Sequence, residues 1–363
     1  MALIIVDAHQ DIAMNALAAG RDYREHSLVK RQREAGTEIV TREGVAMSGL
    51  PDALMGRVAV VFATLFTEPK RVAAMLGLPL GDLSYSTPKE AYTAAMKQVD
   101  YYHRLQDEEP QIRLIKRRGD LDTVLASWDD ARGIDQRLHG LVMLMENGDP
   151  ILEPKQFEEW YEYGVRIVGP AWAATRYSGG TREPGGLTAL GIELLEFMAG
   201  LNAILDLSHM AEQAYFQALE RYQGEVIIAS HSNPRRFSNT DRHLSDDMIR
   251  ALSARDGVIG VVPYNRFLSN TWRPGDPKAG VPLTVLVDAI DHICQITGSA
   301  AHVGIGTDFD GGFGAASTPA GIDSISDLVT IAPVLAERGY PQADIDAIMS
   351  GNFLRKLRQG LPV

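Results

Sequence analysis

The chain has 363 residues, 45% of them hydrophobic, so it can bury a large core. Its 35 basic and 47 acidic residues give a net charge of −12, which argues against a nucleic-acid-binding protein because such proteins carry a basic face. The single cysteine, Cys294, excludes an internal disulfide, and its apolar-periodic surroundings favour a small buried hydrophobic residue on a helix over a reactive thiol.

The start of the chain has no basic segment followed by a long apolar stretch, as a secretion signal would have. No apolar run approaches the ~20 residues that a membrane span requires. Together with the acidic charge, these absences lead us to expect a cytoplasmic protein that does not associate with membranes or nucleic acid.

Eight short apolar runs predict eight β-strands. They are rich in Val, Ile and Leu and lack strict polar alternation, as expected for strands buried on both faces of a parallel sheet. The expected strands cover residues 3–6, 58–62, 141–145, 165–168, 203–207, 226–229, 258–262 and 303–306. The first two connections are long enough to form lids or the contacts of a homodimer.

Helical patterns lie between many of these runs. They cover residues 88–106, 189–201, 210–222, 244–257 and 281–298. In the fourth, Ser245 is the expected N-cap and Gly257 the expected stop. This alternation predicts a (β/α)8 barrel with long early insertions, formed by residues 1–363 as one domain. An open doubly wound sheet is the rival fold, but it would concentrate its site at one switch point.

Histidines and carboxylates follow the strand runs along the whole chain. His9 and Asp11 come after the first run, and residues two apart at a strand end point to the same side. His209 and His231 each end a run in a Ser-His pair, one β/α unit apart, and imidazole suits zinc. Glu146 ends the third run, where an isolated buried charge would be costly.

The last run leads into a glycine-flanked acidic turn. Asp308 comes directly off the strand and is the better candidate for a general base, and Asp310 is a second candidate that could instead stabilise the turn.

In order and combination, these segments resemble the membrane (renal) dipeptidase family, the M19 metallopeptidases of the amidohydrolase superfamily. The strongest stretches are DLSHMAE, IASHSNPR, RHLSDD, GVIGVVPY and HVGIGTDFDGG. The resemblance implies a (β/α)8 barrel that holds two zinc ions and hydrolyses a small-molecule substrate, a dipeptide or a related amide.

The resemblance also implies roles for individual residues. His9 and Asp11 would bind one zinc ion, His209 and His231 the other, and Glu146 would bridge them. Asp308 would exchange protons with the attacking water and the leaving amine. Arg242 would bind the substrate carboxylate, which suits its planar fork, and Tyr264 would contact the substrate.

Two segments depart from the family pattern. The family's glutamate typically stands before two glycines, whereas Glu146 here begins the segment ENGDP. The family carries a histidine after the fourth strand that helps to hold the scissile carbonyl, whereas Trp172 stands at that position here. Arg176 or Tyr177 are candidates to replace its function. The change keeps open a second enzymatic hypothesis, hydrolysis of another small amide, an N-acyl amino acid or a lactone. A third hypothesis is a non-catalytic barrel protein.

Overall fold

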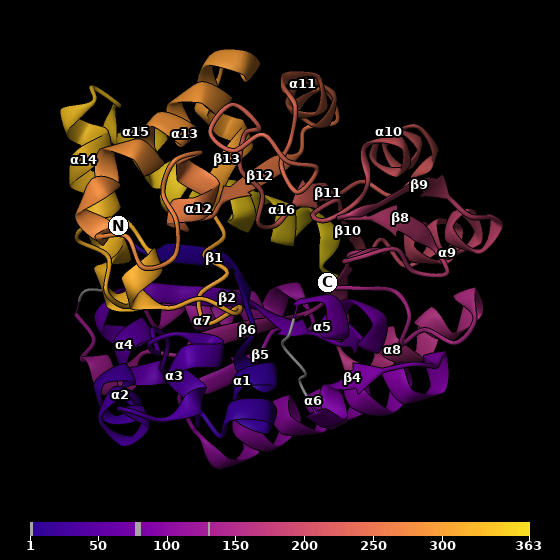
Figure 1. The fold of residues 1–363 in the computed structure, drawn as a ribbon, viewed down its shortest axis with the longest axis horizontal. Helices are drawn as coiled ribbons and strands as arrows, with labels where there is room; N and C mark the ends of the chain where they lie inside the picture. The colour runs from indigo at the N-terminus through magenta and orange to yellow at the C-terminus, as the bar shows by residue number, and fades with distance from the viewer. Residues whose placement is uncertain (1–2, 77–80, 130) are drawn as a thin grey trace.

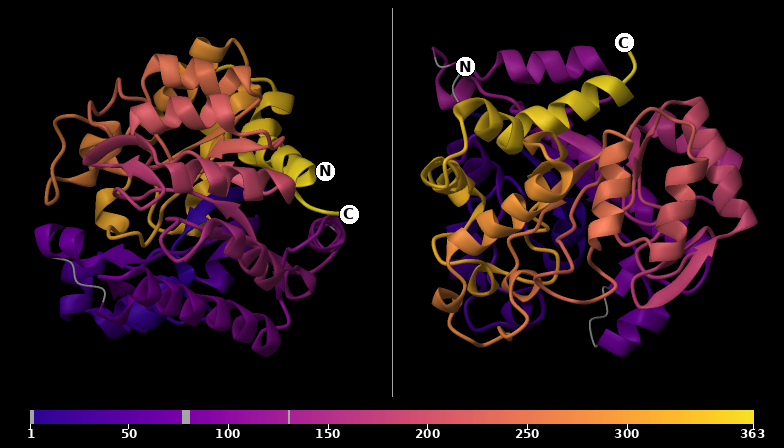
Figure 2. Two further views of the ribbon diagram at one scale, coloured as in Figure 1. Left: turned by 90° about the vertical axis from the view of Figure 1, so that its right-hand side faces the viewer. Right: turned by 90° about the horizontal axis from the view of Figure 1, so that it is seen from above.

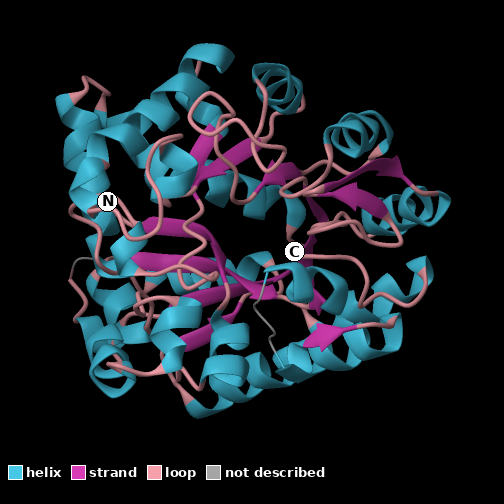
Figure 3. Cartoon of the chain, in the orientation of Figure 1, coloured by secondary structure: helices cyan, strands magenta, loops and turns pink. Residues whose placement is uncertain are grey.

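The computed structural model describes residues 3–76, 81–129 and 131–363, and their strands form a ring enclosed by helices (Figures 1 and 3). Eight parallel strands pair in chain order, and the pairing of Asp7 with Ile305 closes the last strand onto the first. They are β1 (Ile5–Gln10), β2 (Val58–Leu65), β6 (His139–Met145), β7 (Val165–Val168), β10 (Ile204–Asp206), β11 (Ile227–Ala229), β12 (Val258–Val261) and β13 (Val303–Ile305). The predicted (β/α)8 barrel is confirmed, and each of its strands overlaps an expected run.

Burial explains why these runs form strands. Every residue of the eight barrel strands is buried, because side chains fill the barrel interior on one face and helices cover the other. The first strand runs further than predicted, to Gln10, so that His9 lies within it rather than after it. Backbone pairing with β2 carries the strand to Gln10, which partners Ala63, and the two polar side chains satisfy each other, since Gln10 Nε2 donates to Asp7 Oδ2 over 2.6 Å.

The outer helices are α6 (Pro88–Glu108), α7 (Arg118–Ala126), α8 (Phe157–Tyr163), α9 (Ala189–Gly200), α10 (Glu212–Arg221), α11 (Asp246–Ala254), α12 (Asn265–Leu268), α13 (Leu283–Thr297), α14 (Ile331–Glu337), α15 (Gln342–Asp346) and α16 (Asn352–Gly360). Five of them, α6, α9, α10, α11 and α13, overlap the expected positions, and the others were not predicted. Cys294 lies half-buried on α13. The long helix α6 runs along the outside of the barrel (Figures 1 and 2). No helix in the described ranges is both long and apolar enough to cross a bilayer.

Helix α11 confirms one predicted boundary and corrects another. The Ser245 hydroxyl accepts from Met248 N, as an N-cap should. The helix ends before Gly257, because Arg255 is its C-cap and Asp256 takes the left-handed conformation with φ 54°. The helix therefore terminates at polar residues that lie one or two positions before the predicted glycine.

The long early connections carry structure that was not predicted. The first holds α1 (Ile12–Ala19), α2 (Ser27–Glu34), α3 (Glu38–Glu43) and α4 (Leu50–Met55), and the second adds β3 (Glu68–Pro69), α5 (Lys70–Leu76), β4 (Ser84–Tyr85) and β5 (Ile112–Leu114). Strand β5 pairs with the start of β6, whose end pairs with β7. A ribbon of β8 (Ser178–Gly180) and β9 (Glu183–Leu187) follows β7 and packs against α10.

His139, at the start of β6, is a fully buried histidine whose two nitrogens are both used. Nδ1 lies 2.8 Å from Val58 O and therefore carries the proton, while Nε2 lies 3.0 Å from the Tyr23 hydroxyl and accepts from it. Burial lowers the pKa of His139 from 6.5 to about 4, so the folded chain holds the ring neutral.

This histidine makes a testable contribution to stability against acid. Its folded pKa lies below its unfolded pKa, so its contribution is complete above pH 6.5 and declines as the pH falls towards 4, by about 3 kcal/mol in total. We expect His139→Asn, which offers a donor and an acceptor without titrating, to show a shallower loss of unfolding free energy over this interval. Urea unfolding at pH 7.0, 5.5 and 4.5 measures the slopes, and parallel slopes for the two proteins would contradict the assignment.

Candidate metal centre

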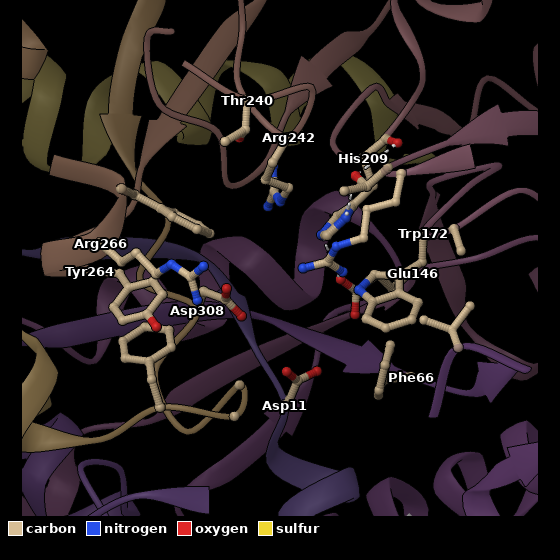
Figure 4. Close-up of a pocket in the computed structure, with 18 of the residues that line it drawn as sticks. Asp11, Phe66, Glu146, Trp172, His209, Thr240, Arg242, Tyr264, Arg266 and Asp308 are labelled. Atoms are coloured by element: carbon tan, nitrogen blue, oxygen red, sulfur yellow. Dashed lines mark hydrogen bonds and ion pairs between the residues drawn. The ribbon is translucent and has the colours of Figure 1, made fainter. Parts of the chain in front are cut away.

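Polar side chains from five barrel strands or the loops after them meet at one mouth of the barrel (Figure 4). The carboxyl ends of all the parallel strands lie at this mouth, so residues distant in the chain come together there. They are His9 within β1, Asp11 at the N-cap of α1, Glu146 after β6, His209 after β10, His231 after β11 and Asp308 after β13.

The Glu146 carboxylate lies at the middle of this group. Its Oε1 is 3.6 Å from Nε2 of His9 and 3.4 Å from Nε2 of both His209 and His231. Nε2 of His209 is 3.0 Å from Nε2 of His231. One carboxylate oxygen is thus surrounded by three imidazole nitrogens, all directed towards it.

Ligand atoms gather in two adjacent groups that share His9. His9, Glu146 and His231 form one, and His9, Asp11 and Asp308 the other, with the ligand atoms of each group within 4.8 Å of one another. His9 is completely buried, and neither of its ring nitrogens has a hydrogen-bond partner among the described residues. Because unpartnered buried nitrogens are costly, this donor set fits divalent cations.

The Nδ1 atoms of His209 and His231 each contact a hydroxyl group of the protein. Nδ1 of His209 lies 3.1 Å from the Thr181 hydroxyl, and Nδ1 of His231 lies 2.8 Å from the Ser230 hydroxyl. Ser230 in turn donates to Asp206 Oδ2 over 2.5 Å. Such contacts fix the ring orientation of metal-binding histidines, so Nε2 of each faces Glu146.

The charges in this group are strongly perturbed. Burial raises the pKa of Glu146 to about 8, and burial together with the charge of Glu146 raises the pKa of Asp11 to about 7. Burial also raises the pKa of Asp308 well above its usual value and lowers the pKa values of His209 and His231. Neutral imidazole is the form that binds metal, and a nearby cation would restore the carboxylates to their charged form.

Three non-glycine residues at the mouth take left-handed backbone conformations: His209 at φ 66°, Asp308 at φ 56° and Asp310 at φ 63°. Such conformations cost energy and persist where surrounding contacts hold them, often at functional sites. Asp308 N donates to His9 O over 3.1 Å, which ties the turn after β13 to β1.

Asp310 is held by a bracket of buried hydrogen bonds. Its carboxylate accepts from Met47 N, Ser48 N and the Arg21 guanidinium. Asn15 Nδ2 donates to both Asp310 O and Asp11 O, over 2.8 and 3.0 Å, and Arg21 donates to Asn15 Oδ1. Asp310 does not line the main cavity, so the contacts support its alternative role as the residue that stabilises the turn.

A cavity of about 420 Å³ opens over the group. Arg242 lines it and donates to His231 O over 2.7 Å and to the Ser232 hydroxyl over 3.3 Å. No carboxylate pairs with this guanidinium among the described residues. Tyr264 also lines the cavity, where its ring stacks on Phe313 with centroids 4.2 Å apart.

Trp172 lines the cavity on the side of His209 and Glu146, while Tyr264 lies on the side of Asp308 (Figure 4). Its ring meets Phe66 edge-on at 5.2 Å and lies 6.0 Å from His209.

The candidate replacements for the family histidine, Arg176 and Tyr177, do not line the cavity. Arg176 donates to the carbonyls of Ile151 and Leu152, and the Tyr177 hydroxyl donates to Ile151 O. That interpretation was wrong because both side chains turn back to close the 151–152 loop.

Several lining residues were not predicted from the sequence. They include Phe66, Arg182, His243, Arg266 and Phe313. Arg266 lies in the short helix α12 and the others in loops that follow the strands, where no apolar periodicity marks a position, although His243 directly follows Arg242 in the RHLSDD segment.

Comparisons of the sequence with known proteins agree with this geometry. A family model described as membrane dipeptidase (peptidase family M19) matches residues 1–360. An uncharacterized protein in the pqqA 5' region of Klebsiella pneumoniae is 33% identical over 215 residues, 57% of this chain and 76% of that protein. Mouse dipeptidase 3 is 25% identical over 286 residues, 75% of this chain and 52% of that protein. The chain therefore spans about half the length of the mouse relative.

Solved structures share the fold. The probable dipeptidase PvdM of Pseudomonas aeruginosa has a TM-score of 0.79 at 21% identity, over 99% of this chain and 96% of that one. A metallopeptidase of Rhodobacter sphaeroides, liganded with a phosphinate mimic of the dipeptide L-Ala-D-Ala, has a TM-score of 0.77 at 20% identity, over 99% of both chains. With the family model matching nearly every residue, the chain belongs to the membrane dipeptidase family of metallopeptidases, peptidase family M19.

Proposed function

We propose that the protein is a binuclear zinc hydrolase that cleaves the amide bond of dipeptides or similar small amides. The observation that carries the proposal is the Glu146 oxygen held 3.4–3.6 Å from three imidazole nitrogens beneath a cavity lined by Arg242. A cavity of about 420 Å³ suits a ligand of dipeptide size. We further propose that residues 1–363 act as one domain, and that a homodimer is its assembled form.

His9 and Asp11 would hold one ion, His209 and His231 the other, and Glu146 would contact both. This combination of imidazole nitrogens and carboxylate oxygens suits zinc. When bound, the ions supply Lewis acidity towards the carbonyl oxygen and a water of lowered pKa.

Asp308 is the proposed proton carrier. It would take a proton from the attacking water and deliver it to the departing nitrogen, and a carboxyl with a raised pKa suits both steps. Its position also supports this role, since Asp308 Oδ1 lies 3.9 Å from Nε2 of His9 and the residue lines the cavity. Arg242 would orient the terminal carboxylate of the substrate, which reduces the number of unproductive poses.

A second candidate function is supported by the apolar side of the cavity. Met14, Phe66, Val72, Trp172 and Ala173 line it. An apolar acyl chain would fit against these side chains, so the alternative function is hydrolysis of N-acyl amino acids. Lactones are a further possible substrate class under the same alternative. Rates with matched dipeptides, N-acyl amino acids and lactones distinguish these substrate classes.

Metal analysis tests the proposed centre. We expect two zinc ions per chain, loss of activity on dialysis against a chelator, and recovery when zinc is returned. Glu146→Gln should lose bound metal, because the amide cannot neutralise two cations, whereas Glu196→Gln, an exposed change on α9, should not. An inactive, metal-free wild-type preparation that cannot be reconstituted would favour the non-catalytic barrel instead.

Asp308→Asn tests the proton carrier. The amide keeps the shape of the side chain but cannot accept a proton, so we expect the metal content to persist and kcat to fall by about 10²–10⁴-fold. Steady-state rates on the best dipeptide, measured alongside zinc content, give the result. A variant that keeps near-normal turnover would remove Asp308 from this role.

A further inference from the structure

His243 is a buried histidine with no function assigned so far. Of the nine histidines, only His9 and His243 have side chains that make no hydrogen bond within the described parts of the chain. His9 belongs to the candidate metal centre, which accounts for its free nitrogens. His243 is 1% exposed, directly follows Arg242 and lines the cavity.

A purely structural histidine would use its nitrogens within the protein. His139 does so, with Val58 O on one nitrogen and Tyr23 on the other. By contrast, Nδ1 of His243 is enclosed and has no partner. Since the residue lines the cavity, Nε2 is the nitrogen that a ligand can reach.

Three polar side chains surround one phenyl ring on this side of the cavity. The His243 ring meets Phe267 edge-on at 4.5 Å, the Arg242 guanidinium lies 5.6 Å from the centre of the same ring, and Tyr264 packs against it at 4.9 Å. The packing on Phe267 fixes the His243 ring beside Arg242. Both residues line the cavity and contact the same ring, so they lie on the same side of it.

The protonation of His243 follows from its surroundings. Burial, reinforced by the charges of Arg242 and Arg235, lowers the pKa of the ring well below its usual value, so it is neutral. A neutral ring carries one proton, which would meet no acceptor on the enclosed Nδ1 but could be donated from Nε2 to water or a ligand in the cavity. The proton therefore belongs on Nε2, which makes this nitrogen a hydrogen-bond donor to the cavity.

We propose that His243 is a specificity-determining residue that donates a hydrogen bond from Nε2 to the terminal carboxylate of the substrate, while Arg242 binds the other oxygen of the same group. The inference rests on the proposed function, in which Arg242 orients that carboxylate. It adds a second donor, His243, to that carboxylate site and makes this residue one source of the discrimination between a terminal acid and its amide.

The chemical basis is the match between donors and acceptors. Two protein donors suit the two carboxylate oxygens, both of which accept. A terminal carboxamide replaces one oxygen with an NH₂ group, so a protein donor would face a substrate donor. A site built in this way rejects the mismatched analogue because buried polar groups are left unpaired.

Paired substrates test this assignment. The four stereoisomers of alanyl-alanine and their C-terminal amides would be assayed with wild-type protein, His243→Phe and His243→Gln. His243→Phe keeps a flat ring against Phe267 but has no donor, and we expect KM for the free acid to rise about 10- to 100-fold with little change in kcat. His243→Gln restores an N–H donor and should recover part of the loss. The preference for acid over amide should shrink in the same order.

His103→Phe is the matched control, because His103 lies on α6 and binds Tyr163 O outside the cavity. Zinc content and thermal unfolding show whether each variant is folded. Wild-type protein that hydrolyses acid and amide equally well, or His243→Phe with an unchanged KM for the acid, would overturn the inference while the proposed function stands. Wild-type protein that hydrolyses none of the acids, nor other dipeptides, would refute the dipeptidase proposal and this inference with it.

Discussion

The site depends on one electrostatic constraint: a buried carboxylate oxygen surrounded by three imidazole nitrogens. Alone in a protein interior, the Glu146 charge would be costly, and the unpartnered nitrogens of His9 would add to that cost. Bound cations would resolve both at once, because they would neutralise the carboxylate and accept the imidazole lone pairs. The barrel provides the rigidity that holds such an arrangement together, since each of these residues lies at or near the end of a strand whose neighbours are all buried.

Much of the architecture could be read from the sequence because the responsible signals are local. A strand that is buried on both faces requires a continuous apolar run, and each of the eight barrel strands coincides with such a run in the sequence. The metal-ligand candidates could be located for the same reason: each lies at, or a residue or two beyond, the end of such a run. The short strand β5 gave no comparable signal, because pairing with the start of β6 rather than its own composition holds it in place.

The residues that line the cavity are harder to predict from the sequence than the strands and the metal-ligand candidates. His243 and Phe66 reach it from loops whose paths depend on tertiary contacts, and no periodic pattern marks them. Arg176 and Tyr177 were predicted to contact the substrate, but their side chains instead donate hydrogen bonds to the carbonyls of residues 151 and 152. Trp172 was located by comparison with a family pattern, and its packing against Phe66 makes one side of the cavity apolar where the Arg242 side offers donors. A substrate would thus meet two chemically different walls, one on each side of the metal centre.

The hydrogen bonds of Asn15 have a mechanical consequence. Its single side-chain nitrogen binds the carbonyls of Asp11 and Asp310, so one amide joins a candidate metal ligand to the turn that carries the candidate base. Those two functional groups therefore form one rigid unit rather than two adjustable parts. A change in the first connection of the barrel that shifts Asn15 or Arg21 would displace both together, so a segment near the start of the chain positions a proton carrier that lies near its end.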